Sequence, residues 1–422
     1  MAKAEQVLCH KLNRVTMAPM LKSLRAVVRF KKFERDPVKR RLSKVANIED
    51  LRRLARRRLP SGVFDYIDGA AEDERTFNRN EAGFAKIGFA PRVLRGNAEI
   101  DTSTTLMGKH LPVPLVLAPT GFTRIAHSQG ELAVARSAAR AGLPYALSTL
   151  GTRSIEEVAE AGDGDKWFQV YVWKDRGLVD EMLDRAATAG YSTAVVTVDT
   201  ATFGRRERDV RRGFTLPPRI GLGTIIDGIR RPGWSLDFVK AEPIMFANVT
   251  GGSVGDGSDP VSLAEYVADQ MDPGLSWEDI DHFREKWPGK MTIKGIQTVA
   301  DAKIAVDRGI DAVILSNHGG RQLDDAPAPI DLLPSVADAL GGHTDIILDG
   351  GIRRGSDVVK AVSLGAKACM FGRAYLYGLG AAGEQGVDFV LEHLVEGVER
   401  TLSLIGCRSL DALGPEYLAD YQ

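Results

Sequence analysis

Short apolar segments alternate along this chain with longer segments that have the character of helices. Eight of the short segments have the length of β-strands, and several are rich in valine and isoleucine, which favour strands. They span residues 111–121, 144–150, 166–172, 192–200, 290–296, 311–320, 344–351 and 367–373. The pattern predicts eight buried strands with helices between them.

The helix-like segments end on glycine, which commonly follows the last turn of a helix because it tolerates a left-handed backbone. Four of them cover residues 131–142, 178–190, 300–309 and 356–365, closing on Gly142, Gly190, Gly309 and Gly365. This alternation predicts an α/β fold, a parallel (β/α)8 TIM barrel. A doubly wound sheet is the competing layout, but its first crossover would carry a glycine-rich phosphate turn, which residues 118–131 lack.

Two parts of the chain depart from the regular alternation. Residues 207–290 separate the fourth strand from the fifth and are far longer than one crossover needs, so they predict a long insertion. Residues 1–44 form a basic N-terminal extension, and the barrel domain is expected over residues 45–422. Residues 47–74 predict two helices, with Asn47 as an N-cap and Pro60 at the start of the second.

Composition excludes several classes of function. The 55 lysines and arginines balance 56 aspartates and glutamates, so the overall charge gives no reason to expect a nucleic-acid partner. Cys9, Cys369 and Cys407 lie far apart and have no metal-ligand spacing, so we expect no metal site and no disulfide scaffold. No apolar run is long enough to span a membrane, and we expect a cytoplasmic protein.

Two segments have a composition suited to the surface of a membrane. Residues 1–58 hold 18 Lys or Arg and 5 Asp or Glu, so they form either a solvated arm or a contact with anionic lipid. Residues 220–238 mix apolar, cationic and tryptophan residues. They either pack on the barrel or a neighbouring subunit, or touch the inner face of the cell membrane peripherally.

Polar residues follow the ends of the predicted strands. In a barrel the carboxyl ends of the strands converge on one face, where active sites of this fold lie. A single such residue is more often a satisfied structural group, but eight strands that each supply one favour a functional site. These residues are Thr120, Ser148, Gln169, Tyr171, Thr197, Asp199, Lys294, His318, Arg321, Asp349, Arg353 and Arg373.

A set of motifs in the same order resembles the FMN-dependent 2-hydroxy-acid dehydrogenases and oxidases. The motifs are "APTG" (118–121), "FQVYV" (168–172), "TVDT" (197–200), "GRRERD" (204–209), "IKGI" (293–296), "SNHGGRQ" (316–322), "LDGGIRRGSDVVKA" (348–361) and "GRAYLYGL" (372–379). The resemblance covers about residues 45–420 and all eight strands. Within the family, "APTGFTR", "LSTL", "WPGK" and "RAYLYGL" are most similar to the respiratory L-lactate dehydrogenases of actinobacteria.

The resemblance implies oxidation of an L-2-hydroxy acid, L-lactate to pyruvate, with electrons passed to a quinone. Such a reaction needs a base, an anion clamp and an electron sink. By resemblance His318 is the base, and histidine suits this task because its ordinary pKa lies near neutrality. Asp199 would stabilise the imidazolium, and Tyr171 would bond the substrate hydroxyl or the developing oxyanion. The substrate carboxylate would be held by Arg206, Arg321 and Tyr66.

The resemblance also implies FMN as the cofactor, without haem. Lys294 would supply a cation beside the part of the flavin that becomes negative on reduction. The residues expected around the ring are Pro119, Thr120, Gly121, Ser148, Gln169, Thr197 and Ser316. The residues expected at the ribityl chain and phosphate are Asp349, Gly350, Gly351, Arg353, Gly372 and Arg373, because the last two strands of a barrel commonly hold a phosphate.

Several questions stay open at this level. Leu150 stands where glycolate oxidases carry a tryptophan, which argues against glycolate and is compatible with lactate. The first alternative function is an O2-dependent L-2-hydroxy-acid oxidase that makes hydrogen peroxide, and the second is a non-catalytic flavin-binding barrel. The resemblance further implies a homo-oligomer, a tetramer in many relatives.

Overall fold

The computed structural model describes residues 34–96, 98–212, 222–249 and 269–419. The chain divides into two compact units, Met1–Lys44 and Val45–Gln422. In the first unit the described part holds helix α2 (Pro37–Leu42), which Asp36 caps by accepting from the amides of Val38 and Lys39. The rest of the predicted basic extension, residues 1–33, lies outside the described residues.

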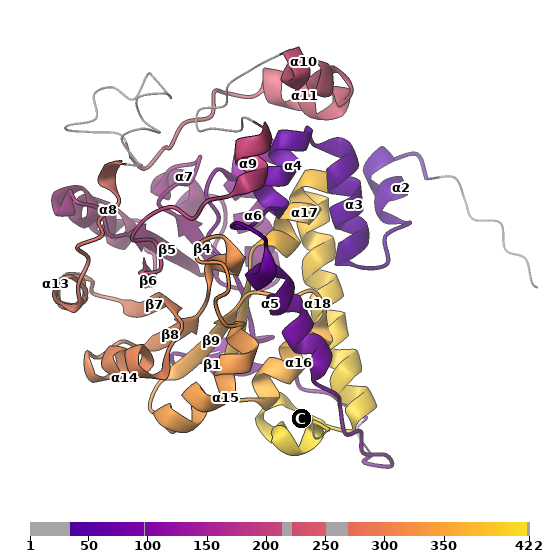
Figure 1. Ribbon diagram of the computed structural model, residues 1–422. Helices are drawn as coiled ribbons and strands as arrows, with labels where there is room; N and C mark the ends of the chain where they lie inside the picture. The colour runs from indigo at the N-terminus through magenta and orange to yellow at the C-terminus, as the bar shows by residue number, and fades with distance from the viewer. Residues whose placement is uncertain (1–33, 97, 213–221, 250–268, 420–422) are drawn as a thin grey trace, which may run out of the picture. The chain divides into compact units, whose positions relative to one another are not determined.

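The second unit is built around a closed barrel of eight parallel strands (Figure 1). The barrel runs in chain order, and it closes where β10 pairs with β3. All eight predicted strands are confirmed. They are β3 (Leu115–Leu117), β4 (Tyr145–Ser148), β5 (Lys166–Tyr171), β6 (Thr193–Thr197), β7 (Lys290–Ile296), β8 (Ala312–Leu315), β9 (Asp345–Asp349) and β10 (Ala368–Phe371).

Helices connect the strands and cover the outside of the barrel, as the pattern predicts. The four glycines predicted to end helices all have positive φ, between +66° and +104°, which confirms them as left-handed C-terminal residues. The helices between the strands include α6 (Gly130–Arg140), α7 (Ile155–Glu160), α8 (Arg176–Thr188), α13 (Trp277–Lys286), α14 (Val299–Asp307), α15 (Pro329–Leu340) and α16 (Gly355–Ser363), and the last strand is followed by α17 (Arg373–Ala382) and α18 (Glu384–Ile405).

A hairpin before the barrel was not predicted. Strands β1 (Thr104–Leu106) and β2 (Lys109–Leu111) pair antiparallel, and Leu106 and Leu111 join the apolar cluster inside the barrel. The first predicted strand is therefore too long at its start, since Leu111 belongs to β2. Pro112 and Pro114 separate the two elements, because proline donates no hydrogen bond to a sheet.

Three helices precede the barrel in the second unit. They are α3 (Ile48–Arg58), α4 (Ser61–Asp68) and α5 (Arg75–Lys86). The Asn47 side chain accepts from the amide of Asp50 at 2.9 Å, which confirms the predicted N-cap of α3. Pro60 directly precedes the first residue of α4. Of the three, α4 lies at the end of the barrel where the candidate site is found.

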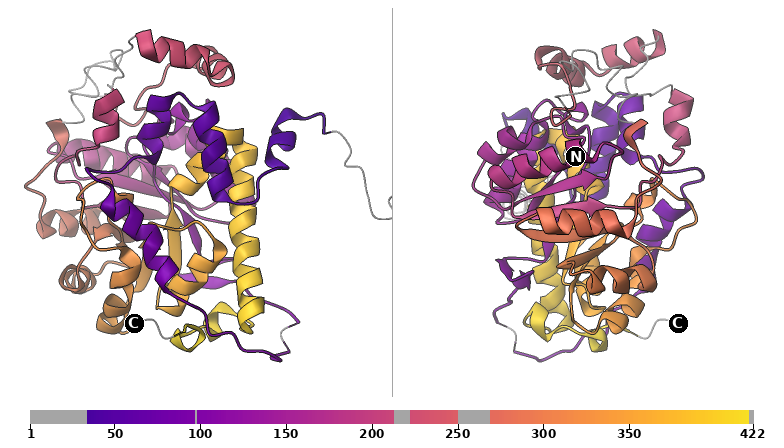
Figure 2. Two further views of the ribbon diagram at one scale, coloured as in Figure 1. Left: turned by 45° about the vertical axis from the view of Figure 1, so that its right-hand side comes forward. Right: turned by 90° about the vertical axis from the view of Figure 1, so that its left-hand side faces the viewer.

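The described part of the chain between β6 and β7 contains three short helices before α13, namely α9 (Glu207–Arg212), α10 (Leu222–Ile229) and α11 (Pro232–Lys240). Helix α11 is fastened to the loop after β3, where Trp234 donates to the carbonyl of Ile125 at 2.8 Å and Asp237 accepts from Ser128. Figure 2 shows α10 and α11 outside the ring of barrel helices, at the end where α4 and α9 lie. Within the described residues, no helix is long and apolar enough to cross a membrane.

Candidate active site

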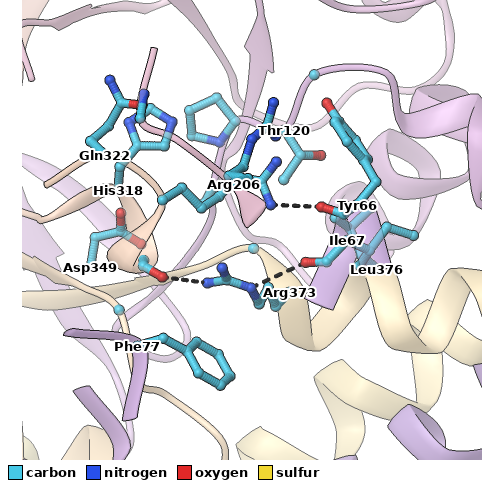
Figure 3. Close-up of a pocket in the computed structure, with 18 of the residues that line it drawn as sticks. Tyr66, Ile67, Phe77, Thr120, Arg206, His318, Gln322, Asp349, Arg373 and Leu376 are labelled. Atoms are coloured by element: carbon cyan, nitrogen blue, oxygen red, sulfur yellow. Dashed lines mark hydrogen bonds between the residues drawn. The ribbon is translucent and has the colours of Figure 1, made fainter. Parts of the chain in front are cut away.

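A cavity of about 500 Å³ opens at the carboxyl ends of the barrel strands. Its walls come from the loops that follow β3, β4, β6, β8, β9 and β10, together with α4, α5 and α9. Figure 3 shows Arg206 between His318 and Tyr66, with Arg373 and Asp349 further along the same cavity. Eight of the twelve predicted strand-end residues line this cavity, namely Thr120, Tyr171, Lys294, His318, Arg321, Asp349, Arg353 and Arg373.

His318 and Asp199 form a close pair at one side of the cavity. His318 follows β8 in the turn His318–Gly320, and its Nδ1 lies 2.9 Å from Asp199 Oδ1. Burial would raise the pKa of Asp199, but the neighbouring His318 and Lys294 outweigh burial and lower it. Asp199 is thus held as a carboxylate. Because Nδ1 faces Asp199, Nε2 is the ring nitrogen left for a ligand in the cavity.

Two tyrosines frame this pair. The Tyr171 ring stacks on the His318 ring with centroids 6.5 Å apart. Burial, with the nearby charge of Asp199, raises the pKa of the Tyr171 phenol, which therefore stays protonated and can donate a hydrogen bond. Tyr66, from α4, lies across the cavity and contacts the ring of Phe122 edge-on.

Two guanidinium groups lie against the Tyr66 ring. Arg206 and Arg321 lie 5.2 and 5.1 Å from its centroid. Arg321 is also fixed by the Tyr66 carbonyl, to which it donates at 2.7 Å. Burial, and then the like charge of Arg206, lowers the pKa of Arg321 to about 9, which leaves Arg321 cationic at neutral pH. Such a pair is ready to receive an anion.

Lys294 is buried below the cavity among acidic and hydroxyl partners. Its Nζ lies 3.0 Å from both Asp349 Oδ2 and Ser316 Oγ. Burial alone would lower the pKa of Lys294, but the charges of Asp349 and Asp199 outweigh burial and raise it. The structure thus places a permanent cation at the end of β7.

The far end of the cavity is basic and lined by glycine. Arg373 donates to the carbonyls of Ile67 and Gly319, as the dashed lines in Figure 3 mark. Arg353 pairs with Glu81 at 2.9 Å. Gly350 and Gly351, with φ of +115° and +82°, and Gly372 also line this end. A β-carbon on Gly351 would collide with the Asn80 carbonyl, so the backbone stays open here.

Four of the predicted cofactor residues lie beside the cavity rather than in its lining. Ser148, Gln169, Thr197 and Ser316 are buried at the ends of their strands. Gln169 Nε2 and Thr197 Oγ1 have no hydrogen-bond partner among the described residues. Buried polar atoms in this state are costly and point to a missing partner. Unsatisfied polar groups near an apolar slot, a buried lysine and a basic, glycine-lined end together fit a flavin mononucleotide.

A model of the family of FMN-dependent dehydrogenases matches residues 55–420. The chain belongs to this family. The FMN-dependent dehydrogenases are defined by their cofactor, so FMN is the cofactor of this protein. Membership of this family agrees with the chemistry of the cavity, which has the cation of Lys294 at one part and the basic end with Arg353 and Arg373 at another.

Relatives of this FMN-dependent dehydrogenase share nearly its whole length. A Mycobacterium tuberculosis protein provisionally named an L-lactate dehydrogenase is 45% identical over 401 residues, covering 95% of each chain. The (S)-mandelate dehydrogenase of Pseudomonas putida is 41% identical, covering 88% of this chain and 93% of the relative. A crystal structure of (S)-mandelate dehydrogenase, described as a monotopic membrane protein, has a TM-score of 0.86 and 40% identity, covering 90% of this chain and 100% of that one.

Several lining residues of this FMN-dependent dehydrogenase carried no predicted role. Phe203, Asp209, Val210 and Phe246 come from the chain between β6 and β7. The sequence pattern of that stretch did not predict a strand or helix that would place these residues at the site. Asp209 and Gln322 do stand inside the motifs "GRRERD" and "SNHGGRQ", and that position was the available signal.

Proposed function

We propose that this FMN-dependent dehydrogenase oxidises L-2-hydroxy acids, with L-lactate converted to pyruvate. The observation that carries the proposal is that Arg206 and Arg321 line one cavity together with His318, whose Nδ1 is paired with Asp199. A 2-hydroxy acid has a carboxylate next to the carbon that bears its hydroxyl. The two pairs match these two groups. Named relatives include L-lactate dehydrogenases of Haemophilus influenzae at 40% identity.

The histidine takes the hydroxyl proton of the substrate in this proposal. His318 Nε2 accepts that proton, while Asp199, bound to Nδ1, stabilises the imidazolium that forms. The carbon loses its hydrogen with two electrons, and the C–O bond becomes a carbonyl. FMN, when bound, would supply the acceptor for this hydrogen together with its two electrons. Tyr171 donates its hydrogen bond to the substrate oxygen during this change.

The arginine pair orients the substrate by its carboxylate. Guanidinium groups offer forked donors that match a carboxylate, and Tyr66 adds its hydroxyl to the same group. Lys294 provides the cation beside the cofactor ring. The residues proposed to hold FMN are Pro119, Thr120, Gly121, Ser148, Gln169, Thr197, Lys294, Ser316, Asp349, Gly350, Gly351, Arg353, Gly372 and Arg373.

Anaerobic bleaching of the bound flavin tests the substrate assignment. The purified protein is mixed with L- and D-lactate, L-2-hydroxybutyrate, L-mandelate and glycolate, and absorbance of the oxidised flavin is followed. We expect bleaching by L-lactate and none by D-lactate. Leu150 leaves room beside the substrate carbon, so larger L-acids should bleach the flavin faster than glycolate. A yellow protein that no L-2-hydroxy acid bleaches would support the non-catalytic flavin barrel instead.

We further propose a quinone as the electron acceptor. The names of the relatives support dehydrogenases for the most part, although an L-lactate oxidase of Nostoc is 39% identical. Turnover of L-lactate is therefore compared with a soluble quinone analogue under nitrogen and with air-saturated buffer alone. We expect at least about tenfold faster turnover with the quinone. Equal rates, with hydrogen peroxide formed in air, would establish the oxidase.

The exposed apolar surface of α10 and α11 supports a peripheral membrane contact. Ile229 and Val239 are 72% and 80% exposed, and Ile225, Ile226 and Leu236 add to the same pair of helices. Arg230 and Lys240 flank these residues with positive charge. Amphipathic, cationic helices of this kind bind anionic lipid surfaces. The relative of known structure that is described as monotopic supports the same proposal.

Sedimentation with anionic phospholipid vesicles tests this contact. We expect the protein to pellet with the vesicles, and the double variant Ile229→Asp, Val239→Asp to stay in the supernatant. Leu404→Asp, at an equally exposed apolar residue of α18, is the matched control and should still pellet. If the wild type, the double variant and Leu404→Asp all stay in the supernatant alike, α10 and α11 are not the membrane contact.

The homotetramer inferred from resemblance is tested by light scattering of the purified protein.

A further inference from the structure

Asp209 is a buried carboxylate inside the cavity that the reaction proposed above does not use. It stands in α9, and its Oδ2 lies 3.2 Å from Arg206 Nε. Both Asp209 oxygens are shielded from solvent, and neither accepts a hydrogen bond from the described residues. The residue lines the same cavity as Arg206 and Arg321.

Among the described residues, charge rather than hydrogen bonding stabilises the Asp209 carboxylate. A buried carboxylate without hydrogen-bond donors is unfavourable, and burial raises the pKa of Asp209. The charges of Arg206 and Arg321 oppose that change and favour the ionised form. Among the described residues, Asp209 is the sole ion-pair partner of Arg206.

The other charged groups near Asp209 do not replace it. Arg208, also in α9, points its guanidinium at Asp68 and Glu74 and is neutralised by them. Asp65 of α4 carries the same charge as Asp209 and raises its pKa further. Among the residues that the structure describes, Asp209 is thus the counter-ion of the arginine pair, and it stands where a bound carboxylate would also be attracted.

We propose that Asp209 weakens the hold of Arg206 and Arg321 on carboxylates and so sets the affinity of the site for its acidic substrate and product. The proposal rests on the function proposed above. With Asp209 ionised, the three side chains carry a net charge of about +1, and a bound monocarboxylate neutralises it. Without the Asp209 charge, the pair keeps its full double charge and binds the same anion more tightly.

Weaker binding of the ground state is useful to such an enzyme. Substrate and product both carry a carboxylate, so the arginine pair attracts them equally before and after oxidation. Binding that is uniform along the reaction lowers KM without raising kcat, and it delays the release of the product. The Asp209 carboxylate competes with substrate and product for Arg206. It therefore limits their uniform binding, while Arg206 and Arg321 stay in position to hold a carboxylate.

The size of the effect follows from the distance between two carboxylates that share one guanidinium. They stand on the order of 6 Å apart, and in a partly solvated site their repulsion changes affinity by at least about tenfold. The effect requires a charged ligand. A neutral analogue, in which an amide replaces the carboxylate, should not respond to the charge at residue 209.

Three variants separate this role from a structural one. Asp209→Asn removes the charge at constant shape, Asp209→Glu keeps it, and Glu207→Gln removes a charge from the same helix outside the cavity. Dissociation constants of pyruvate and of pyruvamide are measured for each oxidised holoenzyme by the change in flavin absorbance. We expect Asp209→Asn to bind pyruvate at least about tenfold more tightly than the wild type, with pyruvamide unchanged. Asp209→Glu and Glu207→Gln should stay within about threefold of the wild type.

The outcomes that would overturn the proposal are distinct. Equal changes in the dissociation constant of pyruvate for Asp209→Asn and Asp209→Glu, or weaker pyruvate binding by Asp209→Asn, would show that Asp209 has a structural role in packing. Asp209→Ser is a second neutral variant and should tighten pyruvate binding in the same direction. Failure of both neutral variants to fold would also overturn the proposal. Bleaching of the wild-type flavin by L-lactate is recorded first, because its absence refutes the proposed function rather than the role of Asp209.

Discussion

At the scale of single residues, the site depends on an unusual backbone after β8. His318, Gly319 and Gly320 have φ of +58°, +64° and +76° in succession. A left-handed histidine is strained, and such strain persists where surrounding contacts fix it, as Asp199 does here. The sequence predicted His318 and Arg321 because both follow a strand. It gave no role to Asp209, because the pairing with Arg206 depends on the path of an insertion without regular periodicity.

Arg321→Met removes one half of the arginine pair while keeping an apolar stem of similar length. We expect the apparent affinity for L-lactate to fall by about 2–5 kcal/mol, because a charge-assisted pair to the carboxylate is lost. The half-saturating L-lactate concentration for flavin bleaching measures this change. Arg211→Met, at an exposed arginine of α9, is the control and should match the wild type. An unchanged affinity in Arg321→Met would remove Arg321 from the clamp.

Gly319→Ala tests the close approach between this turn and the basic end of the cavity. A β-carbon on Gly319 would collide with Arg373 Nη1, and the positive φ adds strain for alanine. We expect Arg373 to move and the dissociation constant of FMN to rise by about tenfold, or about 1.4 kcal/mol. Fluorescence of free FMN after dilution measures this constant. Gly309→Ala, where φ is also positive and no atom lies nearby, controls for backbone strain alone.

At the scale of elements, one buried carboxylate joins the helices that surround the site. Asp68, the last residue of α4, accepts from Arg52 of α3, Arg208 of α9 and Tyr377 of α17. The sequence pattern predicted α3, α4 and the connecting helices from periodicity and capping. It could not predict this junction, since the partners stand up to 309 residues apart. It also missed the β1–β2 hairpin, whose strands of three residues are too short for an alternating pattern.

Asp68→Asn is expected to destabilise the protein by about 3–5 kcal/mol, because it leaves Arg52 and Arg208 without their shared buried partner. Arg52 and the other donors outweigh burial and lower the pKa of Asp68 to about 2 from 3.8. A lowered pKa gives stability that is present above pH 3.8 and is lost as the pH falls through about 2. The shift corresponds to about 2 kcal/mol.

Urea unfolding at pH 7 and at acid pH measures both effects. The difference between the wild type and Asp68→Asn should shrink as the pH approaches 2. Asp73→Asn, at an exposed aspartate between α4 and α5, is the control and should unfold like the wild type at both values. A difference that stays constant with pH would show that the Asp68 charge does not stabilise the junction.

At the scale of the barrel, closure of the sheet brings together residues from distant parts of the chain. β10 pairs with both β9 and β3, so the loops after the first strand and the last two strands share one cavity. The repeated strand and helix pattern was enough to predict this architecture, and it identified several strand-end residues of the lining; other lining residues were implied by the family resemblance, and the rest carried no prediction. The sequence predicted a segment of mixed apolar and cationic composition at α10 and α11, but not which of its apolar residues are exposed. Their exposure depends on which faces of these helices pack against the loop after β3.

The central claim is that His318 starts the oxidation of an L-2-hydroxy acid in a cavity that holds FMN. The most direct test is anaerobic flavin bleaching by L-lactate in the wild type and in His318→Ala, with FMN content measured in both. We predict that the wild type bleaches fully, and that His318→Ala keeps its FMN but bleaches at least about a hundredfold more slowly. Bleaching of His318→Ala at the wild-type rate would contradict the account.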